Sequence, residues 1–297
     1  MLIHQCPEGE KPARVVILGT NGFLARNLAK RLKAKGILAR TVGSKVIDLT
    51  LEGAGDRLAQ ALNAEDSLVV MSAITPDKGR DIKTFMANMV MGENISKALE
   101  LQPVSHIVYI SSDAVYPFTD AAITENIPAA PTDLYSAMHR SREIMLAAAA
   151  KNAPYAILRP TMVLGAGDSH NSYGPNRFRR QAAEKGSIVL NGEGEELRDY
   201  IYIDDALTLI ELVLHHYSLG ILNLATGHSI TFADLSRMVA ACFNPPPRIE
   251  MAERYLPIMH RHFDAGAIHA AFPAFQFTPL KDALAKSHAA ETGPILC

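Results

Sequence analysis

The feature that most constrains the fold is a glycine-containing loop between a short apolar run and an amphipathic segment. Residues 14–19, RVVILG, are rich in β-branched side chains, and residues 23–36 carry apolar side chains at helical spacing. Between them, Gly19, Gly22 and Ala25 permit a tight turn and close packing of helix on strand. Because a helix N-terminus presents free amides and a positive dipole end, the loop predicts a dinucleotide pyrophosphate site. The alternative is a tight turn that binds nothing.

Strand-like and helical segments alternate through the first half of the chain. The runs expected to form strands are 14–19, 37–42, 46–49, 67–73, 104–112 and 155–160, and the helical segments are 23–36, 82–101 and 133–152. Such alternation predicts βαβ units, and near-continuous apolar strands predict a parallel sheet covered on both faces. The expected fold class is α/β: a Rossmann-type doubly wound parallel sheet with a smaller C-terminal α+β substrate-binding region.

The composition changes after Pro160, where we place the main boundary. Residues 161–200 are rich in glycine, asparagine, arginine and tyrosine and look like loops. The expected organisation is a flexible N-terminus at 1–10, an NAD(P)-binding Rossmann domain at 11–160 to which 199–225 returns, and a substrate-binding region at 161–198 and 226–297.

Charge and composition argue against several classes of protein. The formal net charge of −2 gives no basic excess for nucleic acid, and no apolar stretch approaches the ~18–20 residues of a membrane span. The three cysteines are far apart and odd in number, which indicates neither a disulfide framework nor a metal site. We therefore expect a cytoplasmic protein without a metal and without a nucleic-acid or membrane partner.

The residues after the second strand bear on cofactor choice. An NAD site usually carries a carboxylate there for the ribose 2′-hydroxyl, but this chain has Gly43, Ser44 and Lys45. Ser44 and Lys45 could hold a 2′-phosphate, so NADP is favoured slightly over NAD. The alternative for Lys45 is a solvated surface lysine. Asp48 could accept the adenine amino group.

Several ordered motifs carry a family resemblance: GTNGFLA, VVMSAIT, YISSDAVYP, YSAMH, LRPTMVLG, LRDYIYIDD and LNLATG. In this order, the chain resembles the extended short-chain dehydrogenase/reductase superfamily, and most of all its nucleotide-sugar epimerase, dehydratase and reductase branch. The resemblance covers residues 13–285. It implies an NAD(P)-dependent enzyme whose partner is a nucleotide-diphosphate sugar.

The resemblance and the loop chemistry together assign candidate residues. The expected catalytic residues are Ser112, Tyr135 and His139. The expected cofactor contacts are Gly19, Asn21, Gly22, Phe23, Leu24, Ser44, Lys45, Asp48, Leu49, Ser72, Ala73, Ile74, Tyr135 and His139. The expected substrate contacts are Asp113, Asn176, Arg177, Arg198 and Arg261, of which Arg198 and Arg261 are implied to clamp the diphosphate and Arg177 is an addition to them. Asn88 is implied to be structural.

The catalytic motif departs from the superfamily at one position. Removing a proton from a sugar hydroxyl needs a stabilised phenolate at Tyr135, because free tyrosine has a pKa of ~10. The superfamily uses a lysine four residues on, where this chain has His139. A protonated imidazole could supply the charge, whereas a neutral one could only orient the ribose. Tyr135 could also be an ordinary helix tyrosine.

A second departure narrows the reaction. In the resembled 4,6-dehydratases an Asp–Glu pair follows the catalytic residue, but here Ala114 follows Asp113, which argues against 4,6-dehydration. The leading expectation is an epimerase. The alternatives are a one-way NADPH-dependent keto-sugar reductase and a cofactor-binding sensor or scaffold with little turnover. The helices at 82–101 and 133–152 are expected to form a homodimer interface, or else to pack internally.

Overall fold

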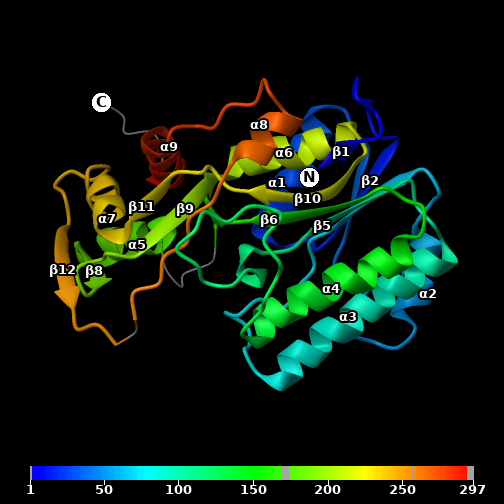
Figure 1. Cartoon of the computed structure of the whole chain (residues 1–297), viewed down its shortest axis with the longest axis horizontal. Coiled ribbons are helices and arrows are strands. Elements are labelled where there is room, and N and C mark those ends of the chain that lie inside the picture. The colour runs from blue at the N-terminus through cyan, green and yellow to red at the C-terminus, as the bar shows by residue number, and fades with distance from the viewer. Residues whose placement is uncertain (1, 169–173, 256, 293–297) are drawn as a thin grey trace.

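The structure is a computed structural model that describes residues 2–168, 174–255 and 257–292 (Figure 1). Its centre is a seven-stranded sheet of order β1-β10-β6-β5-β4-β2-β3, in which β1 is antiparallel to its neighbour and the other pairs are parallel. The strands are β1 (Ile3–His4), β2 (Arg14–Leu18), β3 (Ala39–Val42), β4 (Asp66–Val70), β5 (His106–Ile110), β6 (Tyr155–Pro160) and β10 (Ser218–Leu224). The predicted doubly wound α/β fold is confirmed.

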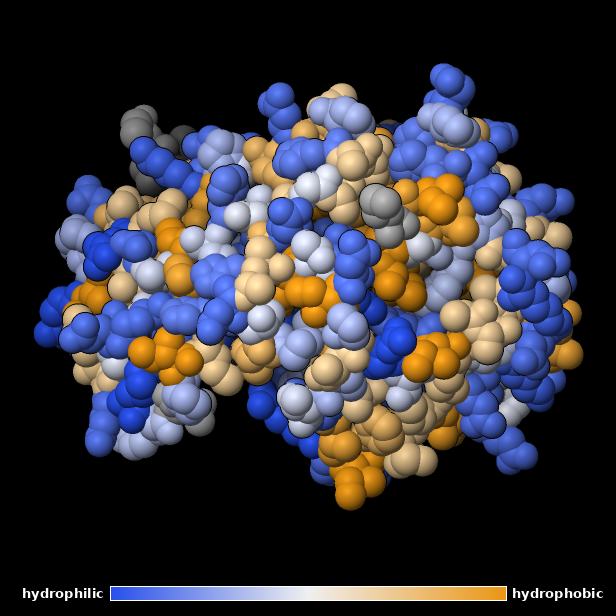
Figure 2. All heavy atoms as spheres, in the orientation of Figure 1, coloured by the Kyte–Doolittle hydropathy of each residue, from blue (hydrophilic) through white to orange (hydrophobic). Residues whose placement is uncertain are grey.

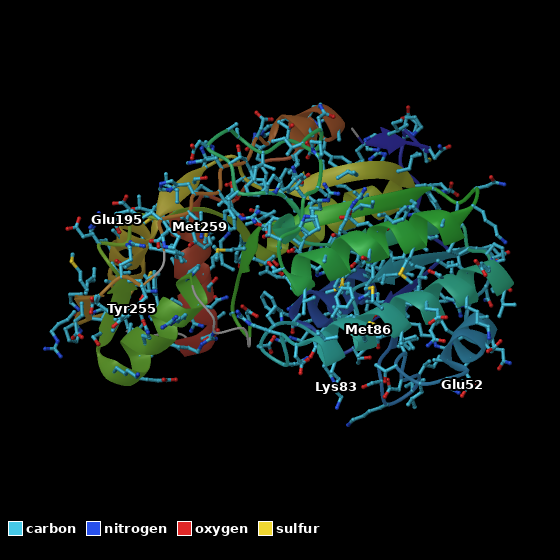
Figure 3. The ribbon with its side chains drawn as sticks, turned by 60° about the horizontal axis from the view of Figure 1, so that its bottom comes forward. Glu52, Lys83, Met86, Glu195, Tyr255 and Met259 are labelled. Carbon is cyan, nitrogen blue, oxygen red and sulfur yellow. The ribbon has the colours of Figure 1, made fainter. Side chains whose placement is uncertain are left out.

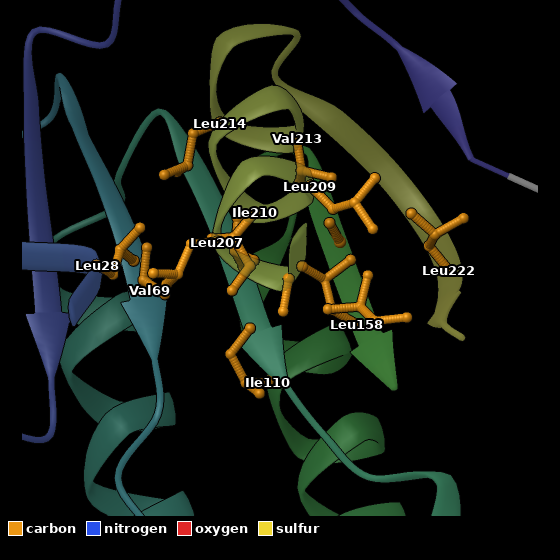
Figure 4. Close-up of a cluster of buried hydrophobic side chains, with 14 of the residues drawn as sticks. Leu28, Val69, Ile110, Leu158, Leu207, Leu209, Ile210, Val213, Leu214 and Leu222 are labelled. Carbon is orange, nitrogen blue, oxygen red and sulfur yellow. The ribbon is translucent and has the colours of Figure 1, made fainter. Parts of the chain in front are cut away.

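Helices cover both faces of this sheet because its strands are apolar on both sides. One layer contains α1 (Phe23–Ala34), α6 (Ile203–His215) and α8 (Gly266–Ala271), and the other contains α2 (Ala54–Ala61), α3 (Ile82–Leu101) and α4 (Leu134–Ala150). Along β2, Val15 and Ile17 face the first layer, whereas Val16 and Leu18 face the second. Figure 4 shows the first core, where Leu209 and its neighbours on α6 pack over the sheet.

The described residues of 161–202, 226–265 and 278–292, hereafter the C-terminal region, lie beside the carboxyl ends of the main strands and contain two smaller sheets. Within 161–200, where loops were expected, the chain forms strands and a helix. The elements are β7 (Met162–Leu164), α5 (Pro175–Lys185), β8 (Ser187–Asn191), β9 (Leu197–Tyr202), β11 (Ser229–Thr231), α7 (Phe232–Ala240), β12 (Arg248–Ala252) and α9 (Leu280–Thr292). They form the sheets β11-β9-β7 and β12-β8 around a separate apolar core. We call the rest of the fold the Rossmann half.

Two sequence expectations are corrected. The first ten residues were expected to be flexible, but β1 pairs with β10, and the His4 ring bonds to the Ser218 hydroxyl and the Ala271 carbonyl at 2.8 and 3.0 Å. The strand expected at 46–49 is absent from the structure, because the amides of Val46 and Ile47 both bond to the Gly43 carbonyl and form a turn.

The molecular surface mixes polar and apolar side chains and is hollowed at one edge. Figure 2 shows a notch between the C-terminal region and the N-terminal end of α4. Apolar side chains gather near the start of α3, where Ile82 and Met86 are 71% and 52% exposed. Among the described helices, none combines the length and apolar character needed to cross a bilayer.

Candidate active site

The loop after β2 has the backbone that the glycine motif predicts. Gly19 adopts φ +114°, and a Cβ there would lie 3.3 Å from the Met71 carbonyl carbon and from the Ser72 amide nitrogen. Only glycine therefore lets this loop approach the end of β4 so closely. Gly22 is the N-cap of α1 and offers no side-chain cap, and no acidic residue occupies the first turn. The amides at this helix end thus remain available to an anion within the described chain.

The loop after β4 forms the opposite wall. Asn88 on α3 accepts a hydrogen bond from the Ile74 amide at 2.9 Å and donates to the Ile74 carbonyl at 3.1 Å, which fixes the predicted cofactor segment Ser72–Ile74. The structural role expected for Asn88 is confirmed. Among the described residues, the buried Ser72 Oγ and His139 Nε2 have no hydrogen-bond partner. Buried polar atoms of this kind fit a site that a polar ligand completes.

The residues predicted to choose between NAD and NADP lie at the end of β3. Ser44 and Lys45 are exposed, Leu49 is buried, and Gly43 lies so close to Thr20 that a Cβ would meet its hydroxyl oxygen at 2.3 Å. Asp48 accepts hydrogen bonds from the hydroxyl and amide of Thr50, which lower the pKa of its carboxyl. Asp48 is thus ionised and already has a local partner.

Tyr135 is held by the capping of α4. The Asp133 carboxylate accepts from the amides of Tyr135 and Ser136 at 2.8 and 2.9 Å, while the Ser136 hydroxyl accepts from the Asp133 amide. This capping box fixes the first turn of the helix. Ser112 follows β5, and its hydroxyl accepts from the Ala114 amide at 3.1 Å. The short helix η1 (Asp113–Val115) packs against α4, which brings the serine and tyrosine segments together.

His139 is buried and neutral. Its ring meets the Tyr135 ring edge-on with centroids 4.7 Å apart, and its Nδ1 lies 2.8 Å from the Tyr109 hydroxyl. Burial, assisted by the charge of Arg142, lowers the pKa of His139 to about 3. This low pKa favours the neutral imidazole over the protonated one that would replace the lysine charge. A neutral ring can still orient a ligand through Nε2.

A buried ion pair braces α4 behind this site. Glu143 accepts from Arg159 Nε and Nη2 at 2.9 and 2.7 Å and from the Ser111 hydroxyl at 2.7 Å. The two ionic side chains are 0% and 2% exposed. Since Ser111 precedes Ser112, this network ties the helix of Tyr135 to the strand end that carries the serine.

The predicted substrate residues Asp113, Arg198 and Arg261 come together. Arg261 donates to the backbone carbonyls of Asp113 and Tyr116 at 2.7 and 3.3 Å, and its Nη1 lies 3.7 Å from the Asp113 carboxylate. Arg198 donates to the Leu197 and Met259 carbonyls. Burial raises the pKa of Asp113, although the nearby Arg261 and Arg198 act to lower it.

Figure 3 shows Met259 on the side of the C-terminal region that is nearer to the Rossmann half, with Glu195 and Tyr255 farther away. The other predicted substrate residues lie on α5. The Asn176 amide donates to Asp168 at 2.7 Å, so this side chain belongs to a different hydrogen-bond group from Arg261. Arg177 is half-buried on the same helix.

Two neighbours of the site were missed by the sequence analysis. Tyr109 is an inward residue of β5, and nothing in its local pattern indicates that it bonds to His139. Arg142 is fully buried beside the same histidine. Its spacing could have revealed it, because positions 135, 139 and 142 share one helix face.

Comparison with known proteins shows the family to which the chain belongs. A protein-family model matches residues 15–225, and its description is "NAD dependent epimerase/dehydratase family". The chain belongs to this family. The family that the motifs indicated is thereby confirmed.

A trifunctional UDP-glucose 4,6-dehydratase/UDP-4-keto-6-deoxy-D-glucose 3,5-epimerase/UDP-4-keto-L-rhamnose-reductase of Arabidopsis thaliana is 23% identical over 277 residues, or 80% of this chain. The chain spans 40% of that relative's length. The fold resembles that of the UDP-glucose 4-epimerase of Thermus thermophilus in complex with NAD, with a TM-score of 0.81, 18% identity, and coverage of 95% of this chain and 100% of that one. It also resembles RMD from Pseudomonas aeruginosa complexed with NADPH, with a TM-score of 0.82, 19% identity, and coverage of 94% and 98%.

Proposed function

We propose that the protein is an NAD(P)-dependent enzyme that acts on a sugar joined to a nucleoside diphosphate, with epimerisation as the leading reaction. The observation that carries this proposal is the arrangement at the end of β5, where Ser112 and Asp113 are consecutive. On one side, α4, which carries Tyr135 and His139, packs against η1. On the other, Arg261 is bonded to the Asp113 carbonyl. The candidate residues for hydride transfer and the candidate arginine for the diphosphate thus lie on either side of the carboxyl end of β5.

Each candidate residue has a role in this proposal. The loop Gly19–Leu24 and the segment Ser72–Ile74 hold the dinucleotide, which supplies hydride transfer when bound. Tyr135 takes the proton from the sugar hydroxyl, and Ser112 donates a hydrogen bond to the same oxygen. His139 orients the ligand through Nε2.

The anion-binding roles lie on the other side of the strand end. Arg198 and Arg261 hold the diphosphate, because guanidinium groups match its oxygens. Asn176 and Arg177 on α5 are proposed as additional contacts.

A one-way reductase of a keto-sugar is the second candidate, and Asp113 favours it. Its partly buried carboxyl has a raised pKa and lies 3.4 Å from the Ser112 hydroxyl, so it can hold a proton beside the oxygen being reduced. A sensor or scaffold is the third candidate, favoured by the neutral His139. The two reactions differ in cofactor handling, because an epimerase must retain its cofactor while a reductase must exchange it.

We further propose that NADP binds more tightly than NAD, because Lys45 is exposed at the end of β3 and the positions directly after that strand, 43–45, hold no carboxylate. Lys45→Ala should weaken NADP binding about tenfold and leave NAD binding unchanged, because the lysine contacts only the 2′-phosphate, which NAD lacks. Titration of both dinucleotides measures this. Lys83→Ala, at an exposed lysine of α3, is the matched control (Figure 3). Equal losses for NAD and NADP would contradict the proposal.

A homodimer through α3 and α4 is also proposed. Ile82 and Met86 on α3 and Ile144 on α4 are more than half exposed, which is unusual for large apolar side chains on adjacent helices. Sedimentation of the wild type and of Met86→Lys tests this. The dimer should dissociate in the variant, and a monomeric wild type would contradict the proposal.

The enzyme proposal is tested by single-turnover reactions with a panel of nucleotide sugars. The wild type should change the reduction state of its nicotinamide with at least one of them. Tyr135→Phe should bind the cofactor with equal affinity and lose turnover by about 10²–10⁴-fold, the range for a positioned acid or base. A wild-type turnover rate in Tyr135→Phe would show that Tyr135 is not the base. Cofactor binding without turnover of any sugar by the wild type would favour the sensor.

A further inference from the structure

Arg142 is a fully buried cation whose charge no carboxylate of the described residues neutralises. Its Nη1 donates to the Ser72 carbonyl at 2.8 Å, and its guanidinium lies over the Tyr109 ring, 5.4 Å from the centroid. Its Nε and Nη2 have no acceptor within the described residues, and it forms no ion pair with them. An unpaired buried charge is costly, so it indicates that the site uses the charge.

The neighbouring glutamate cannot neutralise this charge. Glu143 already accepts hydrogen bonds from Arg159, Arg140 and the Ser111 hydroxyl. The positive field of Arg142 therefore acts on the titratable rings around it.

Those rings form the wall behind the tyrosine site. The titratable and charged groups around Arg142 are His139 and Glu143 on α4, Tyr109 on β5, and Tyr155 and Arg159 on β6. Burial, opposed by Arg142, raises the pKa of Tyr109 to about 12. Tyr109 is thus protonated and donates its hydrogen to His139 Nδ1, which places the imidazole hydrogen on Nε2.

The fold makes room for this arginine. Gly92 on α3 faces it, and a Cβ there would lie 3.2 Å from Arg142 Cγ and 3.4 Å from the Met145 sulfur. Glycine therefore lets the side chain pass between α3 and α4 to the loop after β4. Residues 135, 139 and 142 lie on one face of α4, so the cation stands behind the tyrosine–histidine pair.

We propose that Arg142 supplies the positive charge that stabilises the Tyr135 phenolate, acting across His139 and Tyr109 in place of a cation at position 139. Arg142 is thus a positioning and charge-supplying residue, and it does not contact the reacting atoms. This inference rests on the proposed role of Tyr135. It explains how the site can contain a neutral histidine and still favour a tyrosine anion.

The test is a spectroscopic titration of Tyr135 that needs neither cofactor nor sugar. The chain has nine tyrosines and no tryptophan, so phenolate absorbance is read without indole interference. Subtracting the curve of Tyr135→Phe isolates Tyr135. In Arg142→Gln, which can still donate to the Ser72 carbonyl, the Tyr135 midpoint should rise by about one pH unit. Each variant is paired with its own Tyr135→Phe double variant.

Two controls separate charge from structure. Arg142→Lys keeps the charge and should restore the wild-type midpoint. Arg140→Gln removes a partly exposed charge from the same helix and should leave the midpoint unchanged. An unchanged midpoint in a folded Arg142→Gln protein overturns the proposal, even if its melting temperature falls.

If Arg142→Gln does not fold, Arg142→Met decides, because it removes the charge while its unbranched apolar side chain fills the buried space between α3 and α4. A raised Tyr135 midpoint then supports the proposal, and an unchanged one overturns it. If the proposed enzyme function is wrong, no nucleotide sugar is turned over, but the titration still shows whether Arg142 affects Tyr135. The two failures are therefore distinguishable.

Discussion

Arg159 in the Rossmann half and Arg261 in the C-terminal region are both buried, but they are held by different acceptors. Arg159 is bidentate to the Glu143 carboxylate, so its charge is cancelled inside the protein. Arg261 donates to two backbone carbonyls, and among the described residues its one carboxylate within 4 Å is that of Asp113, at 3.7 Å. Carbonyl acceptors fix the guanidinium and leave most of its charge for an anionic ligand. The first arginine thus braces the scaffold, whereas we propose that the second binds an anionic ligand.

The largest change in stability should follow from breaking the ion pair between Arg159 and Glu143. Arg159→Met leaves Glu143 buried without its main partner, so the free energy of unfolding should fall by about 3–5 kcal/mol. Urea denaturation measures it. The control is Arg237→Met, which removes an arginine from the exposed pair with Asp234 and should cost about 0.2–1 kcal/mol. Similar losses in the two variants would show that Arg159 is not a brace.

The buried histidine of the Rossmann half should make stability depend on pH. The folded-state pKa of His139 is about 3, below the ~6.5 of an unfolded histidine, so the unfolded chain binds the extra proton. The contribution is complete above pH ~6.5 and is lost as pH falls toward the folded value. Acidification from pH 7 to 5 should therefore lower the free energy of unfolding by about 2 kcal/mol through this histidine.

Urea denaturation of His139→Gln at both pH values checks this expectation. The variant should lose less stability on acidification than the wild type by that amount. His228→Gln, at an exposed histidine of the C-terminal region, should not change the pH dependence. If His139→Gln and the wild type respond equally to acid, the histidine is not held neutral.

Removing Arg261 should have the smallest effect on stability. Arg261→Gln breaks hydrogen bonds to neutral carbonyls and leaves no fully buried carboxylate without its partner, so the loss should be about 1 kcal/mol. The same denaturation experiment compares it directly with Arg159→Met. A loss as large as that of Arg159→Met would erase the distinction between the two arginines.

The sequence predicted the Rossmann half better than the C-terminal region, for a physical reason. Strands such as β2 and β6 are runs of mostly apolar residues, so their burial can be predicted from the local sequence. The loop after β2 needs a positive φ at Gly19, so the glycine itself marks the loop. The pairing of β8 with β12, by contrast, joins segments about sixty residues apart. The pairing of β1 with β10 spans more than two hundred residues, so no local pattern could show it.

In the candidate site, too, some features could be predicted from the sequence and others could not. Spacing and motif order identified Ser112, Tyr135 and His139, and the structure brings Tyr135 and His139 into contact. The charge state of His139 could not be read from spacing, because it depends on burial and on Arg142. Likewise, the acceptors of Arg261 depend on the backbone of η1, which lies far away in the sequence.

The most direct test of the account is calorimetric titration of Arg261→Gln and the wild type with nucleoside diphosphates, including UDP, dTDP and GDP. If Arg261 keeps its charge for the ligand, the variant should bind the preferred diphosphate at least tenfold more weakly, a loss of about 1.4 kcal/mol. Its affinity for NADP should not change, and Arg237→Met should bind the diphosphate as the wild type does. Equal diphosphate affinity in Arg261→Gln and the wild type would contradict the claim that the C-terminal region holds its arginine ready for this ligand.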